Sequence, residues 1–344
     1  MLWFKLLLIV VIYFSPQFDT SNEFLFNSKR PLDALAMKLT SWDMVFYATV
    51  AQRGVRYEHE YAFSTFWPLI IRSLSPCDSL VCLTLTGSVI ALICSSAAAI
   101  MVARTAFVAK LDLKSGYRAK DLYILSPAAA FLVAGYPESL FALMSFIGIY
   151  LFYKRYYELS GAIFGASCFL RYNGILWGIL FAYKIFTSKH RVRIFIGGAL
   201  VGVGFLIPQF QIYMAACPGS VWCDYRIPLG YTFIQSKYWG NGFLKYWVPY
   251  NIPNFLFALP TLVLLIISLP VLPMELKLVQ VAYFIGAVFF WHTQIITRVA
   301  SCLPGPYWYL AKHDGSISTK RWTQFFVVWG ITQAALFGAF LPPA

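Results

Sequence analysis

The sequence predicts an all-α integral membrane protein, and two features of its composition indicate this class. Of the 344 residues, 60% are hydrophobic, 19% are aromatic and only 12% are charged, whereas soluble domains carry about 25% charged residues. The hydrophobic residues lie in long blocks, and the mean hydropathy is +0.67. This composition excludes a secreted disulfide scaffold, a collagen-like chain and a disordered tail.

The apolar blocks predict about ten transmembrane or half-membrane helices with large lumenal loops, in a single polytopic domain over residues 1–344. No small-residue cleavage site follows the first block, which favours an uncleaved anchor over the alternative, a cleaved signal peptide. The blocks cover residues 1–14, 80–103, 121–135, 137–153, 158–170, 174–186, 194–214, 252–273, 276–291 and 322–341.

The four blocks between residues 121 and 186 are too short to cross a bilayer as straight helices, since a span needs about 20 residues. They form two pairs, joined by the turns GYPES at 135–139 and RYNG at 171–174. These turns bring Glu138, Arg171 and Asn173 to membrane depth or its lumenal edge. Irregular backbone is tolerated there only inside protein or beside a wet cavity. The three residues either line such a cavity or form the tips of ordinary helix hairpins.

Basic residues predict the orientation. The net charge of +13 would suggest a nucleic-acid partner in a soluble protein, but most basic residues here lie in short connections between apolar blocks, so we expect none. By the positive-inside rule, the connections at 104–120, 154–155 and 189–193 are cytosolic. Counting passes then places both termini in the cytosol and the loops 17–79, 215–251 and 292–321 in the lumen. The pair Lys320–Arg321 departs from this pattern, because it flanks the last block on the predicted lumenal side.

The first large loop, 17–79, holds half of the acidic residues and a candidate base. Apolar residues recur every three or four positions from Leu32 to Gly54, which predicts an amphipathic interfacial helix. Asp43 would lie beside its apolar stripe, near Trp42, where partial burial sharpens a carboxylate as a base. The alternative is that Asp43 marks a helix cap or break after Thr40 and Ser41.

Glu58, His59 and Glu60 follow in the same loop, within the aromatic run YEHEYAF. Such a group binds sugar hydroxyls, shuttles protons or holds a divalent metal, or else it is a solvated turn. Metal is the weakest of these interpretations, because the cluster has one histidine and no second ligand cluster at a structural spacing.

The loop 292–321 supplies candidate phosphate ligands. Arg298 offers a fork of donors suited to phosphate, and His292 lies close to it in sequence. The alternative is interfacial anchoring. Cys217 and Cys223 flank a short polar loop and are either a disulfide or two free thiols. We find no other plausible local cysteine pair.

Six segments in order, taken together, carry a family resemblance over about residues 1–341. They are SWDMVFYATVAQRG, YEHEYAFSTFWPLIIR, LSPAAAFLVAGYPESLFALMSFIG, ASCFLRYNGILWG, the stretch from YTFIQSKYWGNGFLKYW to NIPNFLFALP, and HTQIITRVASCLPGPYWY. The chain resembles the GPI mannosyltransferase 2 family, within the membrane-embedded C-type glycosyltransferases.

The resemblance implies a multispan protein of the endoplasmic reticulum membrane that works on its lumenal face. Members add the second mannose, α-1,6-linked, from dolichyl-phosphate mannose to the GPI-anchor precursor. Asp43, in the pair Trp42–Asp43, matches the catalytic acid of the first lumenal loop. No acid is adjacent to it, so Glu58 and Glu60 are the candidates for a second acid. The resemblance also implies, at least among fungi, a small accessory membrane subunit.

The implied chemistry is an inverting transfer that needs a carboxylate base and cations for the leaving phosphate. We expect Asp43 to be the base, Arg298 and His292 to be the cations, and the reaction to need no metal or other cofactor. The alternatives are another dolichyl-phosphate-sugar transferase, acting on the N-glycan precursor or on protein serine and threonine, a lipid transporter or flippase, and a non-catalytic subunit of a larger complex.

Overall fold

The computed structural model describes residues 2–19, 21–26 and 30–342, and all regular structure within them is helical. The all-α fold class is confirmed. The α-helices are α1 (Leu2–Phe14), α2 (Pro31–Leu39), α3 (Asp43–Arg53), α4 (Phe66–Leu74), α5 (Leu80–Val108), α6 (Leu113–Ile124), α7 (Glu138–Tyr153), α8 (Tyr157–Cys168), α9 (Gly178–Thr187), α10 (Arg191–Ala216), α11 (Gly230–Trp239), α12 (Ile252–Ile267), α13 (Met274–Phe289), α14 (Ile296–Val299), α15 (Gly305–Lys312) and α16 (Ile317–Gly338).

Short 3₁₀ turns connect many of these helices. They are η1 (Glu23–Leu25), η2 (Glu58–Ala62), η3 (Ala129–Leu132), η4 (Tyr172–Trp177), η5 (Val221–Asp224), η6 (Pro249–Asn251), η7 (Leu269–Val271), η8 (Thr293–Ile295) and η9 (Ala300–Cys302).

Three helical segments of the described chain are long and apolar enough to cross a membrane by themselves. They are α5, α10 and the segment Pro249–Val271, which contains α12. Trp3–Phe14 and Glu138–Tyr153 are apolar but shorter. The protein is therefore a membrane protein, and the total of about ten passes stays a prediction.

The block 121–135 is not one continuous helix, which corrects the sequence prediction: only residues 121–124 are α-helical, as the end of α6. Asp112 caps α6 by accepting the backbone N–H of Ser115 at 2.9 Å, so the helix begins inside the expected loop and ends at Ile124. Pro127 follows, and it favours an extended or turn conformation in the residue before it. Residues 125–137 then form turns around the short 3₁₀ turn η3, and residues 126–139 are buried throughout. This irregular backbone is thus surrounded by protein, as it must be if it lies at membrane depth as predicted.

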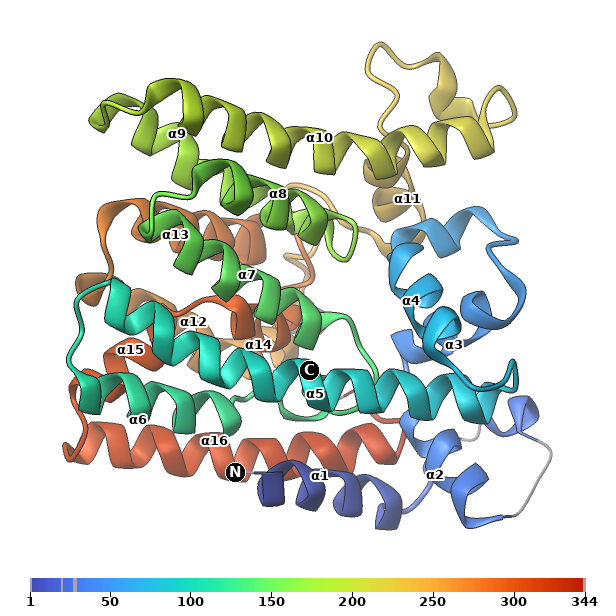
Figure 1. Ribbon diagram of the computed structural model, residues 1–344. Helices are drawn as coiled ribbons and strands as arrows, with labels where there is room; N and C mark the ends of the chain where they lie inside the picture. Colours follow the sequence, from blue (N-terminus) through green and yellow to red (C-terminus); the bar gives the residue numbers. More distant parts are fainter. Residues whose placement is uncertain (1, 20, 27–29, 343–344) are drawn as a thin grey trace.

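Helices α8 and α10 pack through glycines. A Cβ at Gly161 would lie 2.1 Å from the carbonyl oxygen of Gly197, and a Cβ at Gly204 would lie 2.2 Å from that of Gly165. Small residues let two backbones approach closely in a membrane, where close packing takes the place of the hydrophobic effect. This pair anchors α10, which carries the connection to α11 (Figure 1).

The two ends of the bundle differ in what they carry. Figure 1 shows α2, α3, α4 and α11 gathered at one end, opposite the turn between α5 and α6. At the opposite end, Arg118 of α6 pairs with Asp314 at 3.0 Å. α16 starts three residues later, and its last carbonyl, that of Gly338, accepts from Lys38 of α2 at 3.1 Å.

Two predicted placements are therefore wrong. Residues 313–321 lie at the end that carries the basic connection 104–120, so the segment 292–321 is not a single loop beside 17–79. The end of α16 lies beside α2, so it is not at the end of the basic connections. Lys320–Arg321 no longer departs from the positive-inside pattern, because this pair lies at the same end of the bundle as the other basic connections.

Two disulfides are formed. Cys217 bonds Cys223, which decides between the two alternatives for that pair. Cys77 also bonds Cys82, just before and inside the first turn of α5, which the sequence analysis did not anticipate. The three remaining cysteines are free and buried.

Candidate active site

The segment predicted as one amphipathic helix over 32–54 is two helices. α2 ends at Leu39 and α3 begins at Asp43, because Trp42 takes φ 55° and ψ −128°, outside the helical region. The Nε1 of Trp42 donates to the carbonyl of Leu341 at 3.0 Å, and its ring stacks on Phe340 with centroids 5.4 Å apart. The helix break, one of the two alternatives for this position, makes Asp43 the first residue of α3.

The Asp43 carboxylate faces a guanidinium from the far end of the chain. Its side chain is 21% exposed, and Oδ2 accepts from Nη1 of Arg298 at 2.6 Å. Arg298 belongs to the short helix α14. The first turn of α3 also favours negative charge, since its backbone N–H groups have no partner within the helix. Asp43 is therefore a partly open carboxylate in contact with a cation.

A second carboxylate lies beside the same guanidinium. Glu138 is the first residue of α7 and is 1% exposed. Its Oε1 accepts from Nη1 of Arg171 at 2.5 Å and lies 3.5 Å from Nε of Arg298. Its Oε2 has no hydrogen-bond partner among the described residues. We call the four residues Asp43, Glu138, Arg171 and Arg298 the carboxylate–arginine cluster, and their formal charges sum to zero.

Two buried aromatic rings support Arg298. Its Cζ lies 5.0 Å from the ring centroid of Phe131 and 5.8 Å from that of Tyr136. Guanidinium groups are attracted to the faces of such rings. The Tyr136 hydroxyl donates to the carbonyl of Ser41 at 2.8 Å, which ties the rings to the break before α3. The irregular segment 125–137 thus positions Arg298 against Asp43.

Comparison with known proteins identifies the family. A family model described as mannosyltransferase (PIG-V) matches residues 4–275. The chain belongs to this family. It is similar to the GPI mannosyltransferase 2 of Yarrowia lipolytica, with 41% identity over 95% of this chain and 92% of the relative. The corresponding protein of Gibberella zeae is 33% identical over 99% and 95% of the two chains. That of Candida albicans is 30% identical over 99% and 97%. No solved structure matches.

An aromatic wall extends from the cluster of this mannosyltransferase-family chain. Phe46, one turn after Asp43, stacks on Phe63 with centroids 4.5 Å apart. Trp239 packs edge-on against Phe63 at 5.3 Å, and His59 packs edge-on against Phe46 at 5.8 Å. Aromatic faces of this kind suit the apolar faces of sugar rings and isoprenoid chains alike.

His292 lies behind this wall. Its Nε2 is 2.5 Å from the carbonyl oxygen of Trp239, and its ring stacks on Tyr246 with centroids 4.6 Å apart. Burial lowers the pKa of His292 below its usual value, although the Trp239 carbonyl acts in the other direction. At neutral pH this side chain is therefore poorly suited to supply positive charge.

Glu58 connects the first large loop to the segment 215–251. Its Oε1 accepts from Ser220 at 2.9 Å and Trp222 at 3.1 Å, and its Oε2 accepts from Lys237 at 3.0 Å and Tyr238 at 2.7 Å. Burial raises the pKa of Glu58, but these four donors outweigh it and hold the pKa at about 2. Both carboxylate oxygens are thus engaged.

Glu60 is engaged in the same way within its own loop. Both of its oxygens contact the guanidinium of Arg53, and Oε2 also accepts the backbone N–H groups of Arg56 at 2.7 Å and Tyr57 at 3.1 Å. Burial raises the pKa of Glu60, and these donors lower it by more. No hydrogen bond or ion pair of the described residues joins Glu58 or Glu60 to Asp43.

The remaining predicted site residues divide in two. Arg171 joins the carboxylate–arginine cluster, whereas Asn173 contributes its backbone carbonyl, which accepts from the Tyr283 hydroxyl at 3.3 Å. Sequence reasoning missed Phe131 and Tyr136; both lie in the segment that carries Glu138, but nothing in their spacing indicates an arginine. Within the described ranges, no three His, Cys, Asp or Glu side chains lie close enough to hold a metal ion.

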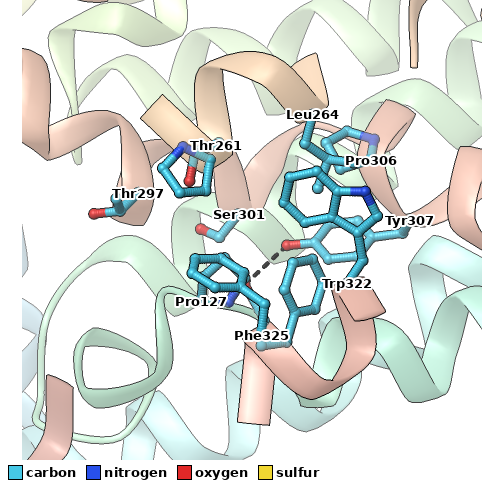
Figure 2. A pocket seen from close by; sticks show the side chains of 13 residues that line it. Pro127, Thr261, Leu264, Thr297, Ser301, Pro306, Tyr307, Trp322 and Phe325 are labelled. Atoms are coloured by element: carbon cyan, nitrogen blue, oxygen red, sulfur yellow. Dashed lines mark hydrogen bonds between the residues drawn. The ribbon is translucent and has the colours of Figure 1, made fainter. Parts of the chain in front are cut away.

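Figure 2 shows a separate pocket between α12, α15 and α16, bordered by Thr297, the neighbour of Arg298 in sequence. Thr261, Ser301 and Tyr307 bring hydroxyls to it, and Trp322 and Phe325 bring rings. No acidic or basic side chain of the described chain lines this pocket. It therefore offers hydroxyl groups and rings but no side chain that is charged at neutral pH.

Proposed function

We propose that the chain transfers the second mannose, in α-1,6 linkage, from dolichyl-phosphate mannose to the GPI-anchor precursor, at the carboxylate–arginine cluster. The observation that carries the proposal is the partly open Asp43 carboxylate, 2.6 Å from Arg298. The similarity to GPI mannosyltransferase 2 proteins over nearly the whole chain supports the substrates. The site lies at the bundle end that carries 17–79, which we assign to the lumen of the endoplasmic reticulum.

The residues take distinct roles in this reaction. Asp43 takes the proton from the 6-hydroxyl of the acceptor mannose, and that oxygen bonds to C1 of the donor mannose. The bond from C1 to the phosphate oxygen breaks, and its electron pair leaves on the dolichyl phosphate. Attack from the opposite face inverts the β-linked donor to an α-linked product. Arg298 stabilises the charge that develops on the phosphate.

Other predicted residues are reassigned in this proposal. Glu58 and Glu60 are structural, because fixed donors occupy both oxygens of each. Trp42 sets the position of Asp43, while His59 and Phe46 offer surface to the acceptor sugar. Glu138 takes the place of the second acid. Arg298 and Arg171 supply the positive charge without a metal ion. An accessory membrane subunit stays a prediction.

The test is a transfer assay with the full chain reconstituted in lipid. Dolichyl-phosphate mannose is the donor, and three acceptors are compared: a GPI precursor with one mannose, the N-glycan precursor, and a peptide rich in serine and threonine. We expect transfer to the GPI precursor only, and equal rates with and without a chelator. Transfer to another acceptor would contradict the assigned acceptor. Complete loss in chelator, restored by one divalent ion, would overturn the metal-free mechanism.

A further inference from the structure

The contact between Asp43 and Arg298 opposes the reaction assigned to both residues. A carboxylate that accepts from a guanidinium at 2.6 Å has one oxygen engaged, and the guanidinium has one of its donors engaged. The cluster has no net formal charge before the donor arrives. A phosphate therefore finds no excess positive charge until one of these contacts opens.

We propose that Asp43 and the donor phosphate compete for the guanidinium of Arg298, and that Glu138 holds this guanidinium in place for either partner. The proposal rests on the proposed function for the identity of the phosphate, which is that of a polyisoprenyl phosphate. Donor binding draws Arg298 away from Asp43 and frees the carboxylate for the acceptor hydroxyl. The engaged Oδ2 of Asp43 thus becomes free only when a donor is bound.

The burial of the two acids separates their roles. Asp43 is 21% exposed, so a ligand reaches the face where it meets Arg298. Glu138 is 1% exposed and approaches the guanidinium at Nε, while also accepting from Arg171. A ligand cannot reach so buried an acid readily, and displacing it would take from Arg171 the carboxylate with which it pairs, which is costly in a buried site. Glu138 is therefore a positioning residue and does not compete.

The charges balance through the proposed step. At the start, the two arginines carry +2, the two acids carry −2 and the phosphodiester carries −1. When Asp43 takes the proton it becomes neutral, and the phosphate gains the electron pair of the broken bond and one negative charge. The total stays at −1. Negative charge thus moves from Asp43 to the phosphate. Because the guanidinium of Arg298 lies between them, it stabilises this change with little reorganisation.

The test is the equilibrium binding of radiolabelled dolichyl phosphate to the full chain in lipid nanodiscs. Asp43→Asn and Glu138→Gln each remove one negative charge beside the same guanidinium. We expect Asp43→Asn to tighten binding by at least about fivefold, a change of about 1 kcal/mol, because the competitor is gone. We expect Glu138→Gln to weaken binding, because Arg298 and Arg171 then repel each other and lose their position.

Two further variants complete the test. In an Arg298→Gln background, Asp43→Asn should no longer tighten binding. Glu275→Gln is the matched control for Glu138: Glu275 is also a buried acid in the first turn of its helix, 3.8 Å from Lys184, and its loss should leave the affinity unchanged. If Glu138→Gln fails to fold, Glu138→Asp keeps the charge with a shorter reach and should weaken binding partly.

The outcomes distinguish this proposal from the proposed function. Equal tightening of dolichyl phosphate binding by Asp43→Asn and Glu138→Gln would show a general charge effect and overturn the competition. Tighter binding of Asp43→Asn in the Arg298→Gln background would also overturn it. So would an unchanged affinity in Asp43→Asn. Loss of turnover in Asp43→Asn with unchanged affinity would leave the function standing alone. Tighter binding with normal turnover would leave the competition standing and remove Asp43 as the base.

Discussion

Asp43 and Glu58 lie in the same loop, yet their surroundings prepare them for different tasks. Glu58 accepts from four side chains, and both of its oxygens are used. Among the described residues Asp43 has one side-chain donor, Arg298, and its side chain is 21% exposed. A carboxylate that works as a base needs a free lone pair within reach of a hydroxyl. The number of fixed donors thus assigns the chemistry to Asp43 and the folding role to Glu58.

The depressed pKa of Glu58 predicts how stability depends on pH. The pKa is about 2 in the folded chain, against an ordinary value of 4.5. The folded state therefore favours the ionised form, and this contribution is complete above pH 4.5 and is lost as pH falls toward 2. In thermal melts in detergent, Glu58→Gln should lower the midpoint at pH 7, and its difference from wild type should shrink below pH 4.5.

Asp78→Asn is the matched control for Glu58→Gln. Asp78 lies in the same loop but is 69% exposed, with Arg72 at 3.7 Å. Exposed ion pairs contribute little to stability, so this variant should melt like wild type. A Glu58→Gln midpoint equal to that of wild type at pH 7 would show that the four hydrogen bonds do not hold the two loops together.

Among the helices, the closest packing is between α8 and α10. Gly161, Gly165, Gly197 and Gly204 leave no room for a Cβ, since each would meet a backbone oxygen of the facing helix within 2.6 Å. In the chain, α8 is followed by Arg171 and then η4, and α10 is followed by η5 and then α11. Helix contact far from Asp43 therefore positions one arginine of the carboxylate–arginine cluster.

Gly204→Ala should lower the thermal midpoint, because the added methyl would lie 2.2 Å from the carbonyl oxygen of Gly165 and force the helices apart. Overpacking of this kind costs about 1–3 kcal/mol. Gly202→Ala is the matched control on the same helix, since its added Cβ would meet no described atom within 4 Å apart from the adjacent backbone of α10 itself. Equal midpoints for the two variants would contradict the packing argument.

On the scale of the whole molecule, the bundle separates a basic end from the end that holds the candidate site. The turn between α5 and α6 and the start of α16 lie at the basic end, while α2, α3 and α11 lie at the other (Figure 1). From this arrangement we predict that residues 30–79 and 313–321 lie on opposite sides of a membrane. Positive charge then marks the cytosolic side.

Thiol labelling in sealed microsomes checks this topology. The three free native cysteines are buried, so a membrane-impermeant maleimide should report only on an introduced exposed cysteine. Ser318→Cys should label in intact vesicles, and Gln52→Cys should label only after detergent is added. Labelling of both positions from the same side would contradict the assignment of the two ends.

The sequence alone indicates the membrane class and the family and makes Asp43 a candidate base, but it does not predict the cluster. Period-three and period-four spacing continues across Trp42, so the helix break there leaves only a weak signal in Thr40 and Ser41. Asp43 and Arg298 are separated by 255 positions, and no local pattern encodes their contact.

The contacts of Glu138 and Glu60 show the same limit of prediction from sequence alone. Glu138 stands out in the sequence by its predicted place in a turn at membrane depth. Its shared contact with two arginines follows the irregular segment 125–137, most of which lies in the apolar block 121–135 that the sequence predicts as a helix. Residues with complete local hydrogen bonding, such as Glu60, look equally suited to catalysis in the sequence. Tertiary contacts decide which acids remain open.

The central claim is that Asp43 activates the acceptor hydroxyl, and turnover of Asp43→Asn in the reconstituted mannose-transfer assay tests it most directly. General-base catalysis contributes about 10²–10⁴-fold. We expect Asp43→Asn to lose at least that order of turnover number while its thermal midpoint stays within the range of wild type, with Asp78→Asn fully active beside it. Turnover of Asp43→Asn near that of wild type would contradict the account.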